Sequence, residues 1–488
     1  MARLTARPAS PWMSRDVRRP SAMQARWLWW AALTVIVLVG LVGRAWNLDF
    51  DHGQHQHPDE RYWAIVSDAM AREEPVSDHG TILAPVVNWL DADTSAANPY
   101  RVVETFPYGP ITLAMSRDTA EWLRAGVDEG SQPALAVAKT LNAVGVPLIN
   151  DDGVAEFDDG YQVELVGRLL SALIDTLTIV VVALIARSLA GRSAGLVGAA
   201  LYAASPLALQ HAHFLGSEPL VAFACGLTVL ASLHLDRGAS ARRAAATGTI
   251  VGIAGGLAVA AKLSGVSVAV VPVFGALALV TMHRRRSDVV RVAAMSVAMF
   301  VSFRVFNPGA FAGLGVLPSD AYRADLERVR TQFDADSPPS IQWAGRSGAG
   351  QAVEWLVRFT VGPGLSILAA IGASVLVRQL WISRPGASPA SNVGRWNAAI
   401  PLAACLVPFA YVLIAALPSG RYFMPMLPTL SALAGVGAAA TWHRAAQIEA
   451  ADRERRRRSV GMRCGVAALV GLGVLWGVMF VHGIYGQE

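Results

Sequence analysis

A run of histidines and carboxylates contains the side chains of this sequence that are best suited to chemistry. It reads Asp-His-Gly-Gln-His-Gln-His-Pro-Asp-Glu, occupies residues 51–60 and follows the first strongly apolar segment directly. Pro58 fits the first position of a helix, so Asp59 and Glu60 would lie in its first turn, where the helix dipole favours carboxylates. A carboxylate at a water–lipid boundary can accept a proton from an attacking hydroxyl group. The same spacing also fits a well-made helix start without function.

The histidines of this run offer a second kind of chemistry. His55 and His57, together with the neighbouring carboxylates, have the nitrogen and oxygen donors that zinc and similar divalent ions bind. His211 and His213, much later in the chain, could join them. We expect these histidines to form hydrogen bonds with a substrate, and we assign no certain metal or other cofactor, with a divalent metal at His55 and His57 as the alternative.

The elements that must position these groups are membrane helices. Of the 488 residues 53% are hydrophobic and 16% are charged, and the mean hydropathy is +0.41, which is too apolar for a soluble globular domain. Apolar runs of a length that can cross a bilayer recur along the chain. The sequence therefore predicts an all-α polytopic membrane protein with about eleven transmembrane helices, near 27–46, 168–188, 194–214, 217–235, 245–262, 265–282, 291–307, 355–377, 398–417, 422–441 and 463–483.

The distribution of charge predicts the orientation of these spans. If the leader of residues 1–26 is cytoplasmic, the leader and the short inner segments together carry most of the Lys and Arg residues, as the positive-inside rule requires. The net charge of +5 then reflects topology and not a nucleic-acid partner. We expect a plasma (inner) membrane protein with a cytoplasmic amino terminus. The expected parts are the leader (1–26), a signal-anchor span (27–46), an outer loop with interfacial helices (47–167), spans two to seven (168–307), a second outer loop (308–354), spans eight to eleven (355–483) and an outer tail (484–488).

The sequence lacks motifs for the use of a nucleotide. It contains no P-loop, no dinucleotide-binding fingerprint and no nucleophile elbow. Both long hydrophilic stretches fall on the outer side in the predicted topology, so the chemistry should occur there. A transferase that works outside the cytoplasm lacks nucleotide-sugars and would need a lipid-linked donor.

Several motifs, in their order along the chain, resemble one enzyme family. These are His57-Pro58-Asp59-Glu60, Asn98-Pro99, Tyr108-Gly109-Pro110, the segments 167–173 and 205–214, Ala261-Lys262-Leu263-Ser264-Gly265, Gln342-Trp343-Ala344-Gly345 and the segment 421–428. They resemble the phospholipid-carrier-dependent glycosyltransferases related to protein O-mannosyltransferases (glycosyltransferase family 39-like), which have the GT-C fold. The resemblance covers most of the chain, and the order of the motifs carries it more than any single motif.

The resemblance implies roles for three carboxylates. Asp59 would be the catalytic base, Glu218 would support the site from the next outer loop, and Glu60 would orient or tune its neighbour. The family usually has Asp at the position of Glu218, so this chain departs from the pattern there. Without the resemblance, Glu218 would also fit an interfacial acid at a helix start.

Basic and aromatic residues would complete the site. Arg168, Lys262 and Arg421 lie at predicted outer ends of spans, against the positive-inside pattern, and could bind the phosphate of the donor. Contact with lipid headgroups is the alternative explanation for these three. The candidate substrate-binding residues are His57, His211, His213, Tyr108, Gln342 and Trp343, and an ordinary interfacial position is the alternative for Trp343.

We therefore expect an inverting hexosyl- or pentosyltransferase. It would move a monosaccharide, mannose-like or a pentose, from a polyprenyl-phosphate carrier to a hydroxyl of a protein, glycan or lipid, with membrane lipid as its surroundings. One rival is a related enzyme that moves another lipid-linked group. A secondary transporter or flippase, for which Asp175 inside a span would be the main candidate residue, and a non-catalytic scaffold are the others.

Overall fold

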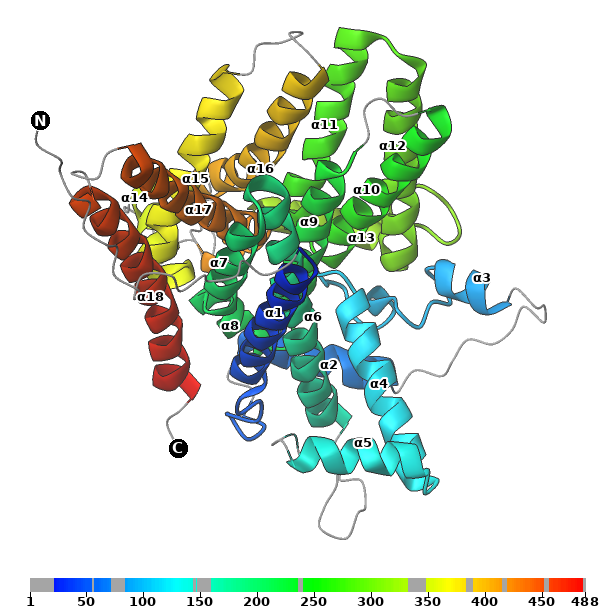
Figure 1. The fold of residues 1–488 in the computed structure, drawn as a ribbon. Coiled ribbons are helices and arrows are strands. Elements are labelled where there is room, and N and C mark those ends of the chain that lie inside the picture. The colour runs from blue at the N-terminus through cyan, green and yellow to red at the C-terminus, as the bar shows by residue number, and fades with distance from the viewer. Residues whose placement is uncertain are drawn as a thin grey trace, which may run out of the picture.

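The computed structural model consists of helices joined by loops (Figure 1). It describes residues 22–54, 57–71, 84–143, 146, 159–235, 240–331, 348–382, 389–414, 419–451 and 456–485. Within these ranges the only β-pairing is an isolated bridge between Phe311 and Pro318. The predicted all-α architecture is confirmed.

Eight helices of the described ranges are long and apolar enough to cross a membrane. They are α1 (Ala22–Ala45), α6 (Asp159–Ala190), α10 (Ala241–Ala261), α11 (Val266–His283), α12 (Arg286–Phe306), α15 (Gly362–Ile382), α16 (Pro389–Ile414) and α18 (Arg456–Tyr485). The other three predicted spans correspond to the pair α7 (Arg192–Ala203) and α8 (Pro206–Ala212), the 16-residue helix α9 (Glu218–Leu233), and α17 (Leu427–Ala451). The count of eleven transmembrane helices stays a prediction.

Two helix breaks place polar residues at one end of the bundle. Between α7 and α8 the backbone of Ser205 is extended, and Pro206, which lacks an N–H, begins the next helix. The Ser205 hydroxyl donates to the carbonyl of Thr360 at 2.9 Å and fixes this corner. Between α10 and α11 the chain is extended at Lys262, at the boundary between the predicted spans 245–262 and 265–282.

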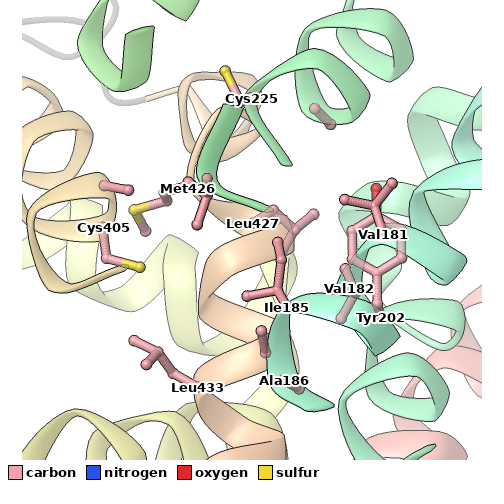
Figure 2. Packing of buried hydrophobic residues seen from close by; sticks show 14 of the residues in the cluster. Val181, Val182, Ile185, Ala186, Tyr202, Cys225, Cys405, Met426, Leu427 and Leu433 are labelled. Atoms are coloured by element: carbon pink, nitrogen blue, oxygen red, sulfur yellow. The ribbon is translucent and has the colours of Figure 1, made fainter. Parts of the chain in front are cut away.

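Tight helix packing forms the centre of the bundle. Val181 and Ile185 of α6 lie beside Leu427 of α17 in the buried cluster (Figure 2). Glycines let α15 and α17 approach closely: a Cβ on Gly372 would lie 1.9 Å from the Leu433 carbonyl oxygen. Small residues at such crossings are the usual means by which membrane helices pack.

The long first hydrophilic loop folds into helices with their own core. It contains α2 (Pro58–Ala71), α3 (Ala84–Leu90), α4 (Ile111–Asp128) and α5 (Gln132–Ala143), and α2, α4 and α5 gather where α1 ends (Figure 1). Trp63 of α2 is fully buried against Phe106. We call this end of the bundle the loop face. The apolar side of α2 thus packs against neighbouring elements, and its position at the membrane interface stays a prediction.

The second hydrophilic stretch is tied to the first by a buried carboxylate. Asp325 lies on α13 (Asp320–Thr331) and accepts hydrogen bonds from the Tyr100 hydroxyl at 2.8 Å and from the backbone N–H of Phe106 at 2.6 Å. Because Asp325 is almost fully buried, these donors replace the water that it loses. Helix α13 is therefore anchored to the loop face.

The acid inside α6 is closed off by its partners. Asp175 accepts hydrogen bonds from Arg44 Nε and from the Tyr202 hydroxyl, both at 2.6 Å, and all three side chains are fully buried. The guanidinium of Arg44 also donates to the carbonyl of Ala203 at 3.0 Å. This cluster connects α1, α6 and α7, so Asp175 serves packing here. It offers no support for the transporter alternative.

Candidate functional site

Glu60 and Arg168 lie at the centre of a buried ion network. Arg168 Nε and Nη2 donate to the two carboxylate oxygens of Glu60, at 2.9 and 2.8 Å, and Nη1 and Nη2 donate to Asp51 at 2.9 and 3.0 Å. Glu164, one turn earlier on α6, is a third ion-pair partner. Glu60 also accepts the backbone N–H of Leu215 at 2.7 Å. These bonds join α2, α6 and the loop before α9.

This network changes the interpretation of two predicted site residues. The sequence predicted Arg168 as a ligand of the donor phosphate, but its side chain has no exposed surface and its donors point at protein carboxylates. Glu60, predicted to share in catalysis, is equally enclosed. Both residues connect elements of the loop face. Removal of either one would leave an uncompensated charge in the interior, which is strongly destabilising.

Asp59, the neighbour of Glu60, points the other way and pairs with a different cation. It occupies the second position of α2, and its carboxylate forms an ion pair with Arg421. Arg421 lies in the short helix η6 (Gly420–Phe423), which precedes α17. The two side chains are 25% and 29% exposed, so a molecule from outside the protein can reach both. The structure thus brings together two residues that are 362 positions apart.

Glu218 and Lys262 form a second ion pair at the loop face. Glu218 is the first residue of α9, and Lys262 is the extended residue between α10 and the short helix η2 (Leu263–Gly265). Their side chains are 8% and 12% exposed, so this pair lies deeper than the pair of Asp59 and Arg421. A cation and an anion thus meet at two points of one region.

Tyr108 connects the two pairs. Its ring lies 5.6 Å from Lys262 Nζ, and its pKa is raised by burial, by the charge of Asp59 and by its hydrogen bond to Asp59. The next residue, Gly109, donates its N–H to the Ala261 carbonyl at 3.0 Å. A Cβ there would lie 1.7 Å from the Ala260 carbonyl oxygen, so only glycine allows this approach. The loop before α4 is thereby held against the end of α10.

The histidines of the sequence prediction take separate positions. His211 is buried within the electrostatic reach of Glu218, Lys262 and Arg421, so it belongs to this region. The ring nitrogens of His213 lie 2.7 Å from the Leu209 carbonyl oxygen and 3.0 Å from that of Trp46, which ties α8 to the end of α1 and leaves no ring nitrogen for a substrate.

His57 caps helix α2. Its Nδ1 accepts the backbone N–H of Glu60 at 3.4 Å, and its ring stacks on Phe214 with centroids 4.3 Å apart. His55, Gln342 and Trp343 lie outside the described residues, so their predicted roles stay predictions.

The arrangement of carboxylates also bears on metal binding. Among the described residues, oxygens of Asp51, Glu60 and Glu164 lie within 4.8 Å of one another, which is a spacing that a cation could bridge. The guanidinium of Arg168 binds all three carboxylates. The chain therefore supplies its own cation at this point.

Sequence reasoning missed part of the buried network. Glu164 was not predicted as a member, although its spacing from Arg168, i and i+4 on one helix, was a usable signal. Asp51 was considered only as a metal ligand. The role of Gly109 depends on a contact with a distant helix end and leaves no local signal.

Comparison with known proteins supports the fold. Residues 160–310 match the family model of the dolichyl-phosphate-mannose-protein mannosyltransferases, a range that includes Glu218 and Lys262 but not Asp59. A search of curated protein sequences finds no match.

Solved structures match along nearly the whole chain. The oligosaccharyltransferase AglB from Archaeoglobus fulgidus, in complex with an inhibitory peptide and a dolichol-phosphate, matches 94% of this chain with 11% identity and a TM-score of 0.51. The apo oligosaccharyltransferase from Archaeoglobus fulgidus matches 96% with 14% identity and a TM-score of 0.52. ArnT from Cupriavidus metallidurans in the apo state matches 96% of this chain and 78% of its own length, with 16% identity and a TM-score of 0.46.

The chain spans only a little over half of the archaeal proteins, 56% and 57% of their lengths. At these identities the likeness concerns the fold. The chain has the GT-C fold, related to that of the protein mannosyltransferases, as the sequence resemblance implied.

Proposed function

We propose that this protein is an inverting glycosyltransferase that takes a monosaccharide from a polyprenyl-phosphate carrier. The observation that carries the proposal is that two ion pairs, Asp59 with Arg421 and Glu218 with Lys262, lie around Tyr108 at the loop face. Carboxylates beside cations are what a transfer between a hydroxyl nucleophile and a phosphate leaving group requires.

Each residue has a defined part in the proposed reaction. Asp59 accepts the proton of the acceptor hydroxyl, whose oxygen attacks the anomeric carbon of the sugar. The bond from that carbon to the phosphate oxygen breaks in the same displacement, and the configuration inverts. Lys262 and Arg421 stabilise the negative charge that develops on the phosphate. Glu218 keeps Lys262 in place.

Three observations support a lipid-linked donor. The matched family model is described by a dolichyl-phosphate-linked sugar, and one archaeal protein of the same fold was solved with a dolichol-phosphate. The sequence has no nucleotide-binding motif. We place the loop face on the non-cytoplasmic side of the plasma membrane, where the positive-inside rule puts the first long loop. In this proposal the sugar is a mannose-like hexose or a pentose, and the acceptor is a hydroxyl of a protein, glycan or lipid.

A transfer assay tests the proposal. Purified full-length protein in lipid would receive a panel of radiolabelled polyprenyl-phosphate monosaccharides and extracted envelope acceptors, with the Asp59→Asn protein alongside. We expect transfer from at least one donor by the wild type, reduced about 10²- to 10⁴-fold by Asp59→Asn. Equal transfer by the two proteins would remove Asp59 as the base, and a wild type that neither transfers nor binds any donor would refute the reaction class.

A further inference from the structure

Of the two ion pairs at the site, the more exposed one joins Asp59 to Arg421, and the proposed reaction requires each of these residues to bind something else. Asp59 must be free to accept a proton, and Arg421 must be free to bind a phosphate. In the structure each is the ion-pair partner of the other. The contact therefore occupies both groups as long as no third charge is present.

We propose that Arg421 is a shared counter-ion, paired with Asp59 in the donor-free protein and passed to the carrier phosphate during transfer. This inference rests on the proposed function and deepens it. It assigns to the contact between Asp59 and Arg421 the role of linking protonation of the base to departure of the leaving group.

The charges of the reaction fit this exchange. The donor is a phosphodiester with one negative charge, whereas the released polyprenyl phosphate is a monoester with about −1.5 to −2 charges at neutral pH. Over the same step Asp59 takes up a proton and loses its negative charge. The total charge of the site is thus conserved, and the negative charge that Arg421 neutralises moves from the carboxylate to the phosphate.

The surroundings make the exchange selective for this pair. Arg421 is 29% exposed and lies on the short helix η6, and its electrostatic partners include Glu218 and Tyr108 as well as Asp59. The deeper Lys262 keeps Glu218, which takes no proton in the proposed reaction. Arg168 cannot exchange, because three carboxylates and the Leu48 carbonyl enclose it.

The inference makes an unusual binding prediction: removal of the catalytic carboxylate should improve binding of the product. In the Asp59→Asn protein Arg421 has lost its ion-pair partner. A polyprenyl phosphate therefore no longer competes with the Asp59 carboxylate for the guanidinium of Arg421. Partly exposed ion pairs contribute about 0.2–1 kcal/mol, which corresponds to a gain in affinity of up to about fivefold.

Equilibrium binding of radiolabelled undecaprenyl phosphate to full-length protein in mixed micelles tests the inference. The proteins would be wild type, Asp59→Asn, Arg421→Gln and the double variant, with Glu327→Gln as the matched control. Glu327 is an exposed carboxylate on α13 that pairs with Arg330 and lies outside the site. Thermal unfolding would verify that each protein is folded. Asp59→Ser, which suits a helix start, would replace Asp59→Asn if that protein were not recovered.

We expect tighter binding by Asp59→Asn, about twofold to fivefold, weaker binding by Arg421→Gln, no added effect of Asp59→Asn in the Arg421→Gln background, and wild-type binding by Glu327→Gln. Unchanged or weaker binding by Asp59→Asn, with weaker binding by Arg421→Gln, would overturn the shared counter-ion and leave the proposed phosphate ligand intact. Unchanged binding by Arg421→Gln would overturn both assignments of Arg421, whereas the transfer assay judges Asp59 as the base independently.

Discussion

Asp59 and Glu60 are neighbours in the chain, yet they lie in opposite surroundings. Glu60 has no exposed side-chain surface and receives hydrogen bonds from Arg168 and from the backbone of Leu215. Asp59 is 25% exposed and pairs with Arg421, itself partly exposed. Consecutive residues of a helix point in different directions, so one turn of α2 serves two regions.

The difference shows how burial separates a charge that is fixed in place from one that can change its partner. A buried pair has given up its water and cannot release its partner without a large cost, whereas a partly exposed pair contributes little and exchanges partners readily. The buried network therefore holds α2, α6 and the loop before α9 in place, and the exposed pair keeps a carboxylate and a guanidinium available. The same residue types support both uses.

The largest effect should follow from a break in the buried network. Arg168→Gln would leave Asp51, Glu60 and Glu164 close together without their cation, so we expect a loss of about 3–5 kcal/mol in the free energy of unfolding. Chemical unfolding in detergent would measure it. Arg323→Gln, which removes an exposed pair on α13, is the control and should change stability by under about 1 kcal/mol. Equal stability of the two variants would contradict the structural role of Arg168.

A smaller effect is expected where the exposed region is anchored. Gly109→Ala would place a Cβ 1.7 Å from the Ala260 carbonyl oxygen and push Tyr108 away from the two ion pairs. A displacement of about 1 Å can lower a rate about 10²-fold, so sugar transfer should fall to that extent. Gly471→Ala on α18, where a Cβ meets nothing within 4 Å, is the matched control. If both variants transferred sugar like the wild type, Tyr108 would not depend on this contact.

The link between the two hydrophilic stretches should matter less. Asp325→Ala would leave the Tyr100 hydroxyl and the Phe106 N–H without their buried acceptor and should cost about 2 kcal/mol of stability. Hydrogen exchange should rise in α13 and around residues 99–106, while α6 stays protected. Protection that is unchanged in α13 would show that other contacts hold it.

The smallest predicted effect is a loss of stability at pH 10. Burial and the charge of Asp325 raise the pKa of Tyr322 from 10.0 to about 12. Because the folded pKa lies above the unfolded one, the stability from this residue is complete below about pH 10 and is lost as the pH rises towards 12. At pH 10 the loss is about 0.4 kcal/mol. A Tyr322→Phe protein should lack this part of the pH dependence, and identical slopes of stability against pH for both proteins would refute it.

The sequence predicted the helices and named several residues that the structure brings together. Hydrophobic runs predicted the membrane helices, and the boundary between the predicted spans 245–262 and 265–282 coincides with the extended residue Lys262. Asp59, Glu218, Lys262 and Arg421 were named from motifs and from charge at helix ends, and the structure brings them together.

The sequence did not separate Arg421 from Arg168, and it gave Asp59 and Glu60 different roles only through the family resemblance. Asp59 and Glu60 are both carboxylates at a predicted helix start, and Arg168 and Arg421 are both arginines at predicted outer ends of spans. Their roles depend on which side of a helix faces the interior and on partners more than a hundred residues away. Residue type and spacing carry no such information.

Paired alanine substitutions of these two neighbours would test the central claim most directly. Sugar transfer and the free energy of unfolding would be measured on Asp59→Ala and Glu60→Ala proteins in the same lipid. We predict that Asp59→Ala loses transfer about 10²-fold or more but at most about 1 kcal/mol of stability, and that Glu60→Ala loses about 3 kcal/mol or more of stability. A stable Glu60→Ala protein without activity, or an unfolded Asp59→Ala protein, would contradict the division between a buried structural carboxylate and an exposed reactive one.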